Sequence, residues 1–258
     1  MLTKVYSAAI EGVDAFPVTI ETVVERGVGF TIVGMADTAV KESYQRIVAA
    51  MNQSGIKFPH RKTVINLAPA DVKKEGASFD LPMAVGVLAS NDLVKSGPLQ
   101  ECMITGELSL DGSVLPVKGV LPIAIKAREM GFKRLIVPMA NVTEAAVVNR
   151  LDVFGVENLP QAVDLINGTA DMKPFVIDTR ELFAKQSGSF DFDFSEVKGQ
   201  EAVKRAFEVA CAGGHNILMA GPPGSGKSML ARRLPGILPN MTRREALEAT
   251  QIHSVLGL

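Results

Sequence analysis

Eight consecutive residues near the end of the chain have the types and spacing of a phosphate-binding loop. They match the pattern G-x-x-x-x-G-K-[ST] and are Gly221, Pro222, Pro223, Gly224, Ser225, Gly226, Lys227 and Ser228. Glycines let the backbone curl so that successive N–H groups point at an anion. A lysine supplies positive charge for the β- and γ-phosphates, and a serine hydroxyl is a hard oxygen ligand for Mg²⁺. The loop therefore predicts a nucleoside triphosphate site in which Ser228 contacts Mg²⁺.

The segments on either side of this loop fit the same interpretation. The apolar run 216–220 (NILMA) predicts a short buried strand, and residues 229–234 predict a helix stopped by Pro235. A phosphate loop needs a strand before it and a helix after it, whose free N–H groups and dipole favour an anion. A chance match in a glycine-containing loop is the alternative, and both flanks argue against it.

Composition sets the class of protein. The chain has 258 residues, of which 47% are hydrophobic and 21% charged, which is typical of a globular protein with one large or two ordinary domains. A net charge of −1 offers no overall basic surface for nucleic acid, although a local patch stays possible. Cys102 and Cys211 lie far apart in apolar runs and are expected to be buried free thiols in a reducing cytoplasm. We expect no signal peptide and no membrane span.

Residues 1–168 alternate between the periodicities of strands and helices. Period-2 or apolar runs predict strands at 5–10, 16–21, 30–33, 62–67, 102–110, 134–137 and 151–156. Helices are predicted at 38–53, 79–91, 121–130, 143–148 and 161–166. Asp37 or Thr38 can cap the first helix, and Asp111-Gly112 predicts a hairpin turn. The alternation predicts an α/β fold, as an α+β two-layer domain followed by the start of an α/β module.

The alternation of strand and helix patterns stops between residues 169 and 190, which are rich in glycine, proline, serine and glutamine. We interpret this stretch as a linker between a domain at 1–168 and a second region at 191–258. The second region is expected to hold helices at 201–212 and 242–254. The pairs Arg232-Arg233 and Arg243-Arg244 are expected on solvated helix faces rather than at a DNA contact.

The second region resembles a known ATPase module. Residues 194–200 (FSEVKGQ), together with the phosphate loop, resemble the opening of an AAA+ module of the magnesium-chelatase type. The resemblance implies that the backbone at 197–199 borders an adenine pocket. An ordinary helix N-terminus is the alternative for these residues, and it stays open.

The first domain resembles the proteolytic domain of Lon through residues 74–78 (KEGAS) and 105–117 (TGELSLDGSVLPV). Ser78 falls at the nucleophile position of that family, which uses a lysine as base. Here Leu121 stands at the lysine position, and Lys118 lies three residues away. Phe79 and Asp80 also replace small residues. We therefore expect a Lon-like domain without the catalytic lysine, in which Ser78 is a loop or cap residue.

A Lon-like domain before a magnesium-chelatase-like module resembles the YifB/ComM family across essentially the whole chain. The resemblance implies an AAA+ ring motor, a homo-oligomer such as a hexamer, with ATP and Mg²⁺ as cofactors. It also implies DNA as a partner, in branch migration by a helicase during recombination and natural transformation. The DNA role rests on the resemblance alone.

The region after Ser228 departs from a complete AAA+ module. No apolar strand ending in an acidic pair follows, and no sensor or arginine-finger position can be assigned. We expect a truncated module that binds ATP weakly and does not hydrolyse it. A Lon-like ATP-dependent peptidase, a magnesium-chelatase subunit and a non-enzymatic platform at 1–168 are the alternative functions.

Overall fold

The computed structural model describes residues 2–59, 61–178 and 192–257. The chain forms two compact units, residues 1–177 with 248–258, and residues 178–247. The strands of the first unit are β1 (Leu2–Glu11), β2 (Asp14–Glu25), β3 (Phe30–Val33), β4 (Lys62–Ala68), β5 (Cys102–Ile104), β6 (Glu107–Leu108), β7 (Val114–Leu115), β8 (Arg134–Pro138) and β9 (Asp152–Val156). Its helices include α1 (Thr38–Gln53), α2 (Asp80–Ala89), α3 (Ser96–Leu99), α4 (Val120–Glu129), α5 (Val142–Ala146) and α6 (Leu159–Asn167). The mixture of strands and helices confirms the α/β class.

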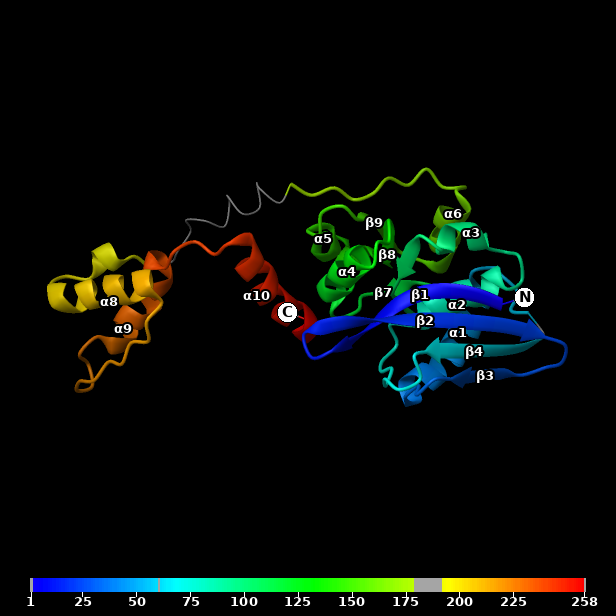
Figure 1. Ribbon diagram of the computed structural model, residues 1–258, viewed down its shortest axis with the longest axis horizontal. Coiled ribbons are helices and arrows are strands. Elements are labelled where there is room, and N and C mark those ends of the chain that lie inside the picture. The colour runs from blue at the N-terminus through cyan, green and yellow to red at the C-terminus, as the bar shows by residue number, and fades with distance from the viewer. Residues whose placement is uncertain (1, 60, 179–191, 258) are drawn as a thin grey trace. The chain divides into compact units, whose positions relative to one another are not determined.

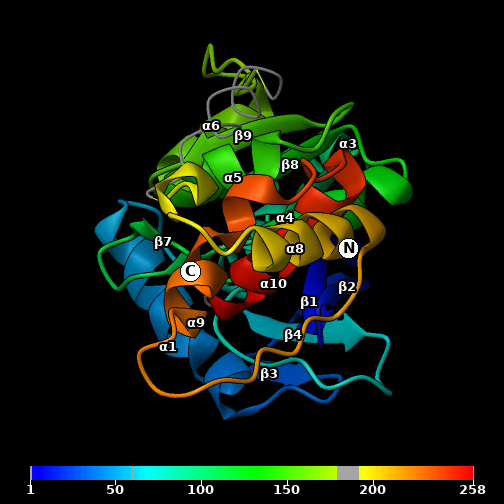
Figure 2. The same cartoon turned by 90° about the vertical axis from the view of Figure 1, so that its left-hand side faces the viewer.

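Seven strands form one sheet in the order β3-β4-β2-β1-β5-β8-β9, and β6 pairs with β7 in a separate hairpin. The pairs β1–β2 and β2–β4 are antiparallel, and the other four pairs of the large sheet are parallel. Strands β3 and β9 therefore lie at opposite edges, as Figures 1 and 2 show. The β1–β2 hairpin closes at the pair Glu11 and Asp14 through Gly12, whose φ of +63° suits glycine.

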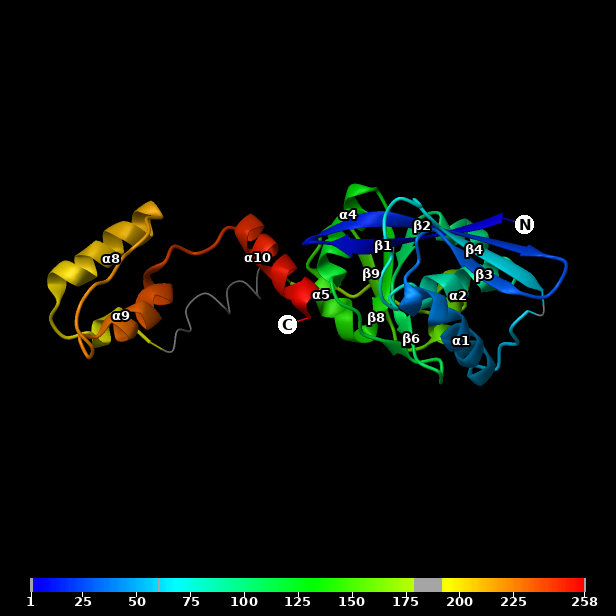
Figure 3. The same cartoon turned by 90° about the horizontal axis from the view of Figure 1, so that it is seen from below.

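Helices α1 and α2 lie on the same side of strands β1, β2 and β4 (Figure 3). Helix α1 has the bounds predicted from its period, and the Asp37 carboxylate caps it by accepting from the Val40 N–H at 2.7 Å. All ten residues of α2 are buried, because this helix lies between the sheet and α1. The core of the unit joins α2 to apolar residues of β1, β2, β4 and α1.

One outer edge of the sheet is covered by the chain itself. Beyond α6 the chain returns along β9, where the Phe175 N–H donates to the Val153 carbonyl at 2.8 Å. At the opposite edge, β3 pairs with β4 alone, and the side chains of Thr31 and Val33 are exposed. The two edges of the sheet therefore differ: β9 is partly covered by a later segment of the chain, and β3 has β4 as its one strand partner among the described residues.

The prediction of one strand over 102–110 was wrong, because the chain leaves the sheet after Ile104. The Gly106 N–H donates to the Ser78 carbonyl at 2.9 Å, and its own carbonyl accepts from the Leu81 N–H at 3.0 Å. A Cβ at Gly106 would lie 3.1 Å from the side chains of Leu81 and Val114. The glycine thus lets the chain pass close to the start of α2 and enter the β6–β7 hairpin.

The second unit contains α8 (Glu201–Gly213), α9 (Lys227–Arg233) and the short 3₁₀ turns η2 (Phe194–Glu196) and η3 (Leu234–Ile237). Helix α10 (Arg243–Leu256) belongs to the first unit from Glu248 onward. A small cluster of buried Val197, Phe207 and Leu230 holds the second unit together, with the Phe194 and Phe207 rings 5.6 Å apart. Residues 216–220 form no strand, contrary to prediction, since no described strand pairs with them.

Candidate functional site

The phosphate loop joins residues 216–220 to α9 and is largely exposed. Gly224 and Gly226 have φ angles of +82° and +86°, in the left-handed region that favours glycine. A Cβ at Gly221 would lie 3.0 Å from the Ser225 hydroxyl, so this position also favours a residue without a side chain. Ser228 lies in the first turn of α9 with an exposed side chain. The three glycines thus have distinct local roles in bending the loop.

The Lys227 ammonium is folded back into this loop. It donates to the carbonyls of Gly221 at 2.8 Å and Pro222 at 2.7 Å, and to the Ser225 hydroxyl at 3.2 Å. All three acceptors are neutral oxygens, so the positive charge has no counter-ion among these partners. An anionic phosphate oxygen is a stronger acceptor for an ammonium than a carbonyl. The donor set therefore fits a phosphate group, with Lys227 free to exchange loop oxygens for phosphate oxygens.

A cavity of about 500 Å³ adjoins the loop, within the size range of small-molecule sites. Its polar lining residues include Ser225, Lys227 and Gln200. The other lining residues are mainly apolar and include Val203 and Phe207 of α8. A ligand with an anionic group and a flat apolar group matches this combination.

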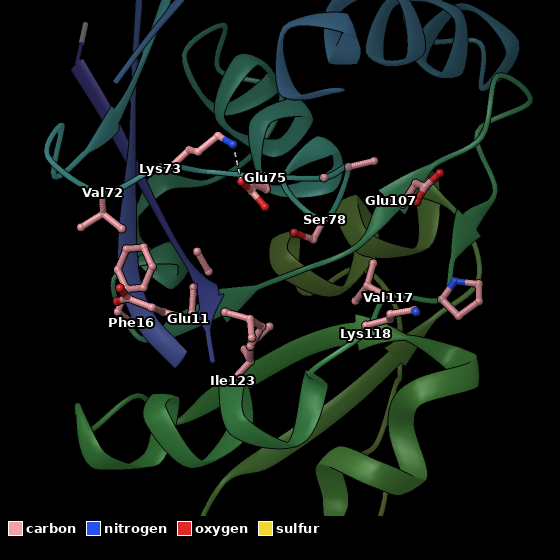
Figure 4. Close-up of a pocket in the computed structure, with 16 residues that line it drawn as sticks. Glu11, Phe16, Val72, Lys73, Glu75, Ser78, Glu107, Val117, Lys118 and Ile123 are labelled. Atoms are coloured by element: carbon pink, nitrogen blue, oxygen red, sulfur yellow. Dashed lines mark ion pairs between the residues drawn. The ribbon is translucent and has the colours of Figure 1, made fainter. Parts of the chain in front are cut away.

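The residues that resemble Lon line a second cavity, of about 640 Å³, in the first unit (Figure 4). Ser78 lies on its wall, and its carbonyl accepts from the Gly106 N–H. Its hydroxyl has no hydrogen-bond partner among the described residues. Lys73 and Glu75 form an ion pair of 2.5 Å on the same wall, and both are exposed. The cavity thus holds a serine without an adjacent base.

The two residues near the Lon lysine position do not supply that base. The Lys118 ammonium donates to the Leu256 carbonyl at 3.1 Å and points away from Ser78 (Figure 4). Leu121 is fully buried in α4. Its N–H donates to a Glu144 carboxylate oxygen at 3.2 Å and to the Ser254 hydroxyl at 3.3 Å. The geometry offers no activated nucleophile at Ser78.

Lys74 stabilises the loop that precedes Ser78, a role that the sequence did not reveal. Its side chain is fully buried, and its ammonium donates to the carbonyls of Val72, at 2.7 Å, and of Pro69. Burial lowers the pKa of this ammonium, and the nearby Asp71 carboxylate opposes the shift. Lys74 thus fixes the loop that leads to Ser78.

Arg233 is a second residue whose role the sequence did not indicate. The pair Arg232-Arg233 was expected on a solvated face, and Arg232 is exposed. The side chain of Arg233 is only 12% exposed and pairs with Glu196. Its partners lie about forty positions earlier in the chain, so no local pattern could have identified them.

Within the described ranges, no helix is long and apolar enough to cross a membrane. The same residues contain no group of three or more histidine, cysteine, aspartate or glutamate side chains that could hold a metal ion.

Comparison with protein families assigns both parts of the chain to the same class. Residues 20–141 match the family described as subunit ChlI of Mg-chelatase, and residues 193–258 match magnesium chelatase, subunit ChlI. The chain belongs to this magnesium-chelatase ChlI family of AAA+-like ATPases.

Curated relatives place the chain more narrowly. It is 39% identical to competence protein ComM of Haemophilus influenzae over 256 residues, which cover 99% of the chain and 50% of the relative. It is 37% identical to the Escherichia coli protein YifB over 258 residues, again 99% of the chain and 50% of the relative. Within the family it is therefore a YifB/ComM magnesium-chelatase-like protein. The chain spans about half the length of these relatives.

The chain also has a relative among the Lon proteases. Bacillus subtilis Lon protease 2 is 28% identical over 144 residues, which cover 54% of the chain and 25% of that protein. The match supports the Lon-like resemblance found in residues 74–78 and 105–117. This sequence similarity bears on the fold of the chain. The reactivity of Ser78 is judged from the residues that surround it.

Proposed function

We propose that this chain binds ATP with Mg²⁺ at residues 221–228 and serves as the nucleotide-binding part of an AAA+ motor. The observation that carries the proposal is the Lys227 ammonium, held inside a loop bent by two left-handed glycines. This arrangement places a mobile positive charge where phosphate oxygens can replace three neutral acceptors.

Each loop residue has a separate task in the proposed site. Gly221, Gly224 and Gly226 shape the backbone, Pro222, Pro223 and Ser225 complete the turn, and Lys227 and Ser228 contact the ligand. Bound ATP with Mg²⁺ would supply the energy of phosphoryl transfer. Lys227 would offset charge on the phosphates, and Ser228 would offer one oxygen to the metal. The apolar wall with Val203 and Phe207 would exclude water from the base.

The proposal also covers the oligomeric state and the partner of the whole protein. We propose that the whole protein forms a homo-oligomeric ring, a hexamer, in the cytoplasm. Its proposed partner is DNA, moved by ATP-driven branch migration during recombination and natural transformation. One relative is named competence protein ComM, and the resemblance to its family is what suggests this partner. The two free, buried cysteines accord with a reducing compartment.

A binding experiment on this chain tests the proposal. Titration with a fluorescent ATP analogue and Mg²⁺ should give saturable binding that unlabelled ATP competes away. Lys227→Ala should abolish it, because a methyl group cannot replace the ammonium. Arg205→Ala is the matched control, since this cation of α8 is exposed and pairs with Glu208. Equal binding by the parent chain and Lys227→Ala would refute the proposed site.

A further inference from the structure

The two adjacent arginines at the end of α9 have different surroundings. Arg232 is exposed, whereas the side chain of Arg233 is only 12% exposed. A long charged side chain on the surface of so small a unit loses rotamer entropy when it is held in one place. Specific contacts must offset that loss, and Arg233 makes them with every part of its guanidinium.

These contacts join α9 to the segment that precedes α8. The Arg233 Nε donates to the Asp193 carbonyl at 3.0 Å, and Nη2 donates to the Glu196 carboxylate. On the side of its own helix, Nη1 donates to the Met229 carbonyl at 3.0 Å. The guanidinium also lies over the Phe192 ring, 5.3 Å from its centroid. One planar group thus binds the segment 192–196 to the helix that follows the phosphate loop.

The segment held in this way continues directly into the wall of the 500 Å³ cavity. Val197 is buried in the small core, and Gly199 and Gln200 follow with left-handed φ angles of +69° and +56°. A left-handed conformation is unfavourable for glutamine, so neighbouring contacts must hold it. The Gln200 amide lies beside the phosphate loop, since a Cβ built on Gly226 would be 3.7 Å from it. The placement of this wall therefore depends on how 192–196 is anchored.

We propose that Arg233 is a positioning residue that fixes the start of α8, whose apolar residues line the nucleotide cavity. It acts through the segment 193–200 and does not itself line the cavity. The inference rests on the proposed function, because it assumes that the cavity receives a nucleotide. Arg233 governs the fit of the nucleoside part against α8, while Lys227 governs the phosphates.

The experiment compares two ligands in the full 258-residue chain. ATP is expected to contact both the phosphate loop and the apolar lining residues, whereas inorganic tripolyphosphate is expected to contact the phosphate loop alone. Competition against a fluorescent ATP analogue gives the affinity of each. Arg233→Met keeps the apolar stem and removes the hydrogen bonds, and Arg232→Met is the matched control. Arg233→Lys keeps the charge but loses the planar arrangement of donors.

Arg233→Met should weaken ATP binding by about tenfold, an effect of the size of one lost charge-assisted hydrogen-bond pair, and leave tripolyphosphate binding within about twofold. Arg232→Met should change neither, and Arg233→Lys should fall between the parent chain and Arg233→Met. A general loss of structure would weaken both ligands together, so the ratio of the two affinities separates positioning from misfolding.

Glu196→Gln provides a second variant if Arg233→Met does not fold. It removes the charge of a half-exposed partner and leaves α9 unchanged, so it should shift the same ratio in the same direction by a smaller factor. An unchanged ratio in folded Arg233→Met, or in Glu196→Gln where the former does not fold, would overturn the inference while ATP binding stands. If the parent chain binds neither ligand, the proposed function fails and the inference fails with it.

Discussion

The Arg46 guanidinium of α1 holds the Asp80 carboxylate at the start of α2 through two hydrogen bonds. Nε donates to Oδ2 at 2.5 Å and Nη2 donates to Oδ1 at 3.0 Å. The Asp80 side chain is fully buried, and its Oδ2 also accepts from the Leu108 N–H of β6 at 3.3 Å. The pair thus joins three elements around the loop that carries Ser78.

Breaking this pair should destabilise the first unit strongly. Arg46→Met leaves a buried carboxylate without its partner and should cost about 3–5 kcal/mol of unfolding free energy. Arg46→Met with Asp80→Leu should recover part of that loss, because no buried charge remains unpaired. Urea denaturation measures both. Lys41→Met, at an exposed position of α1, is the control and should change stability by less than about 0.5 kcal/mol. Equal stability of Arg46→Met and the parent chain would contradict the prediction.

This chain should not hydrolyse ATP. Hydrolysis needs a group that positions the attacking water and a carboxylate near the metal. In the described part of the chain after Ser228 there are helices and loops but no strand that carries an acidic pair. A phosphate-release assay on the parent chain should therefore match Lys227→Ala. Steady release that Lys227→Ala abolishes would show that another group performs this task.

Ser78 should not behave as a nucleophile. Its hydroxyl has no base partner among the described residues, and Lys118 is engaged by the Leu256 carbonyl. We expect no cleavage of casein or fluorogenic peptides, with or without ATP, and no labelling by a fluorophosphonate. The measurement is mass spectrometry of the treated chain, with Ser78→Ala as control. Labelling of the parent chain that disappears in Ser78→Ala would refute this prediction.

Cys102 should be inert in the folded chain. Burial raises the pKa of its thiol from an ordinary 9.0 to about 12, so at pH 8 only about one thiol in ten thousand is ionised. In a Cys211→Ser background, Ellman's reagent should react only after unfolding. Reaction of the folded chain at the rate of an exposed thiol would contradict the assignment.

The same shift predicts an alkaline loss of stability. A raised pKa means that the folded chain retains the proton more strongly than the unfolded chain does. The contribution to stability is complete below pH 9 and is lost as the pH rises toward about 12. In the Cys211→Ser background, Cys102→Ala should remove this part of the pH dependence. Denaturation at pH 8 and pH 10 measures the change in unfolding free energy for both variants. An equal change in the two variants would contradict the prediction.

The features that could be predicted from the sequence are those that local physics determines. The period of residues 38–53 separates apolar from charged faces, and the observed α1 has those bounds. In the phosphate loop, the glycines and Lys227 interact with residues at most six positions away. Such patterns require no knowledge of distant contacts.

The features that could not be predicted depend on distant partners. The split of 102–110 follows from the approach of Gly106 to Leu81, and the absence of a strand at 216–220 follows from the lack of a described neighbour. Arg232 and Arg233 are identical in type, yet only Arg233 meets Asp193 and Glu196. The domain limits at 168 and 191 stay predictions.

The hydrogen bond from the Phe175 N–H to the Val153 carbonyl affects how this protein can self-associate. An edge strand with free backbone groups is a template on which another polypeptide can add a strand. Along β9 the chain's own backbone already occupies part of that template. Strand addition, whether in assembly or in aggregation, is therefore directed to β3, which has four residues and offers few sites for pairing.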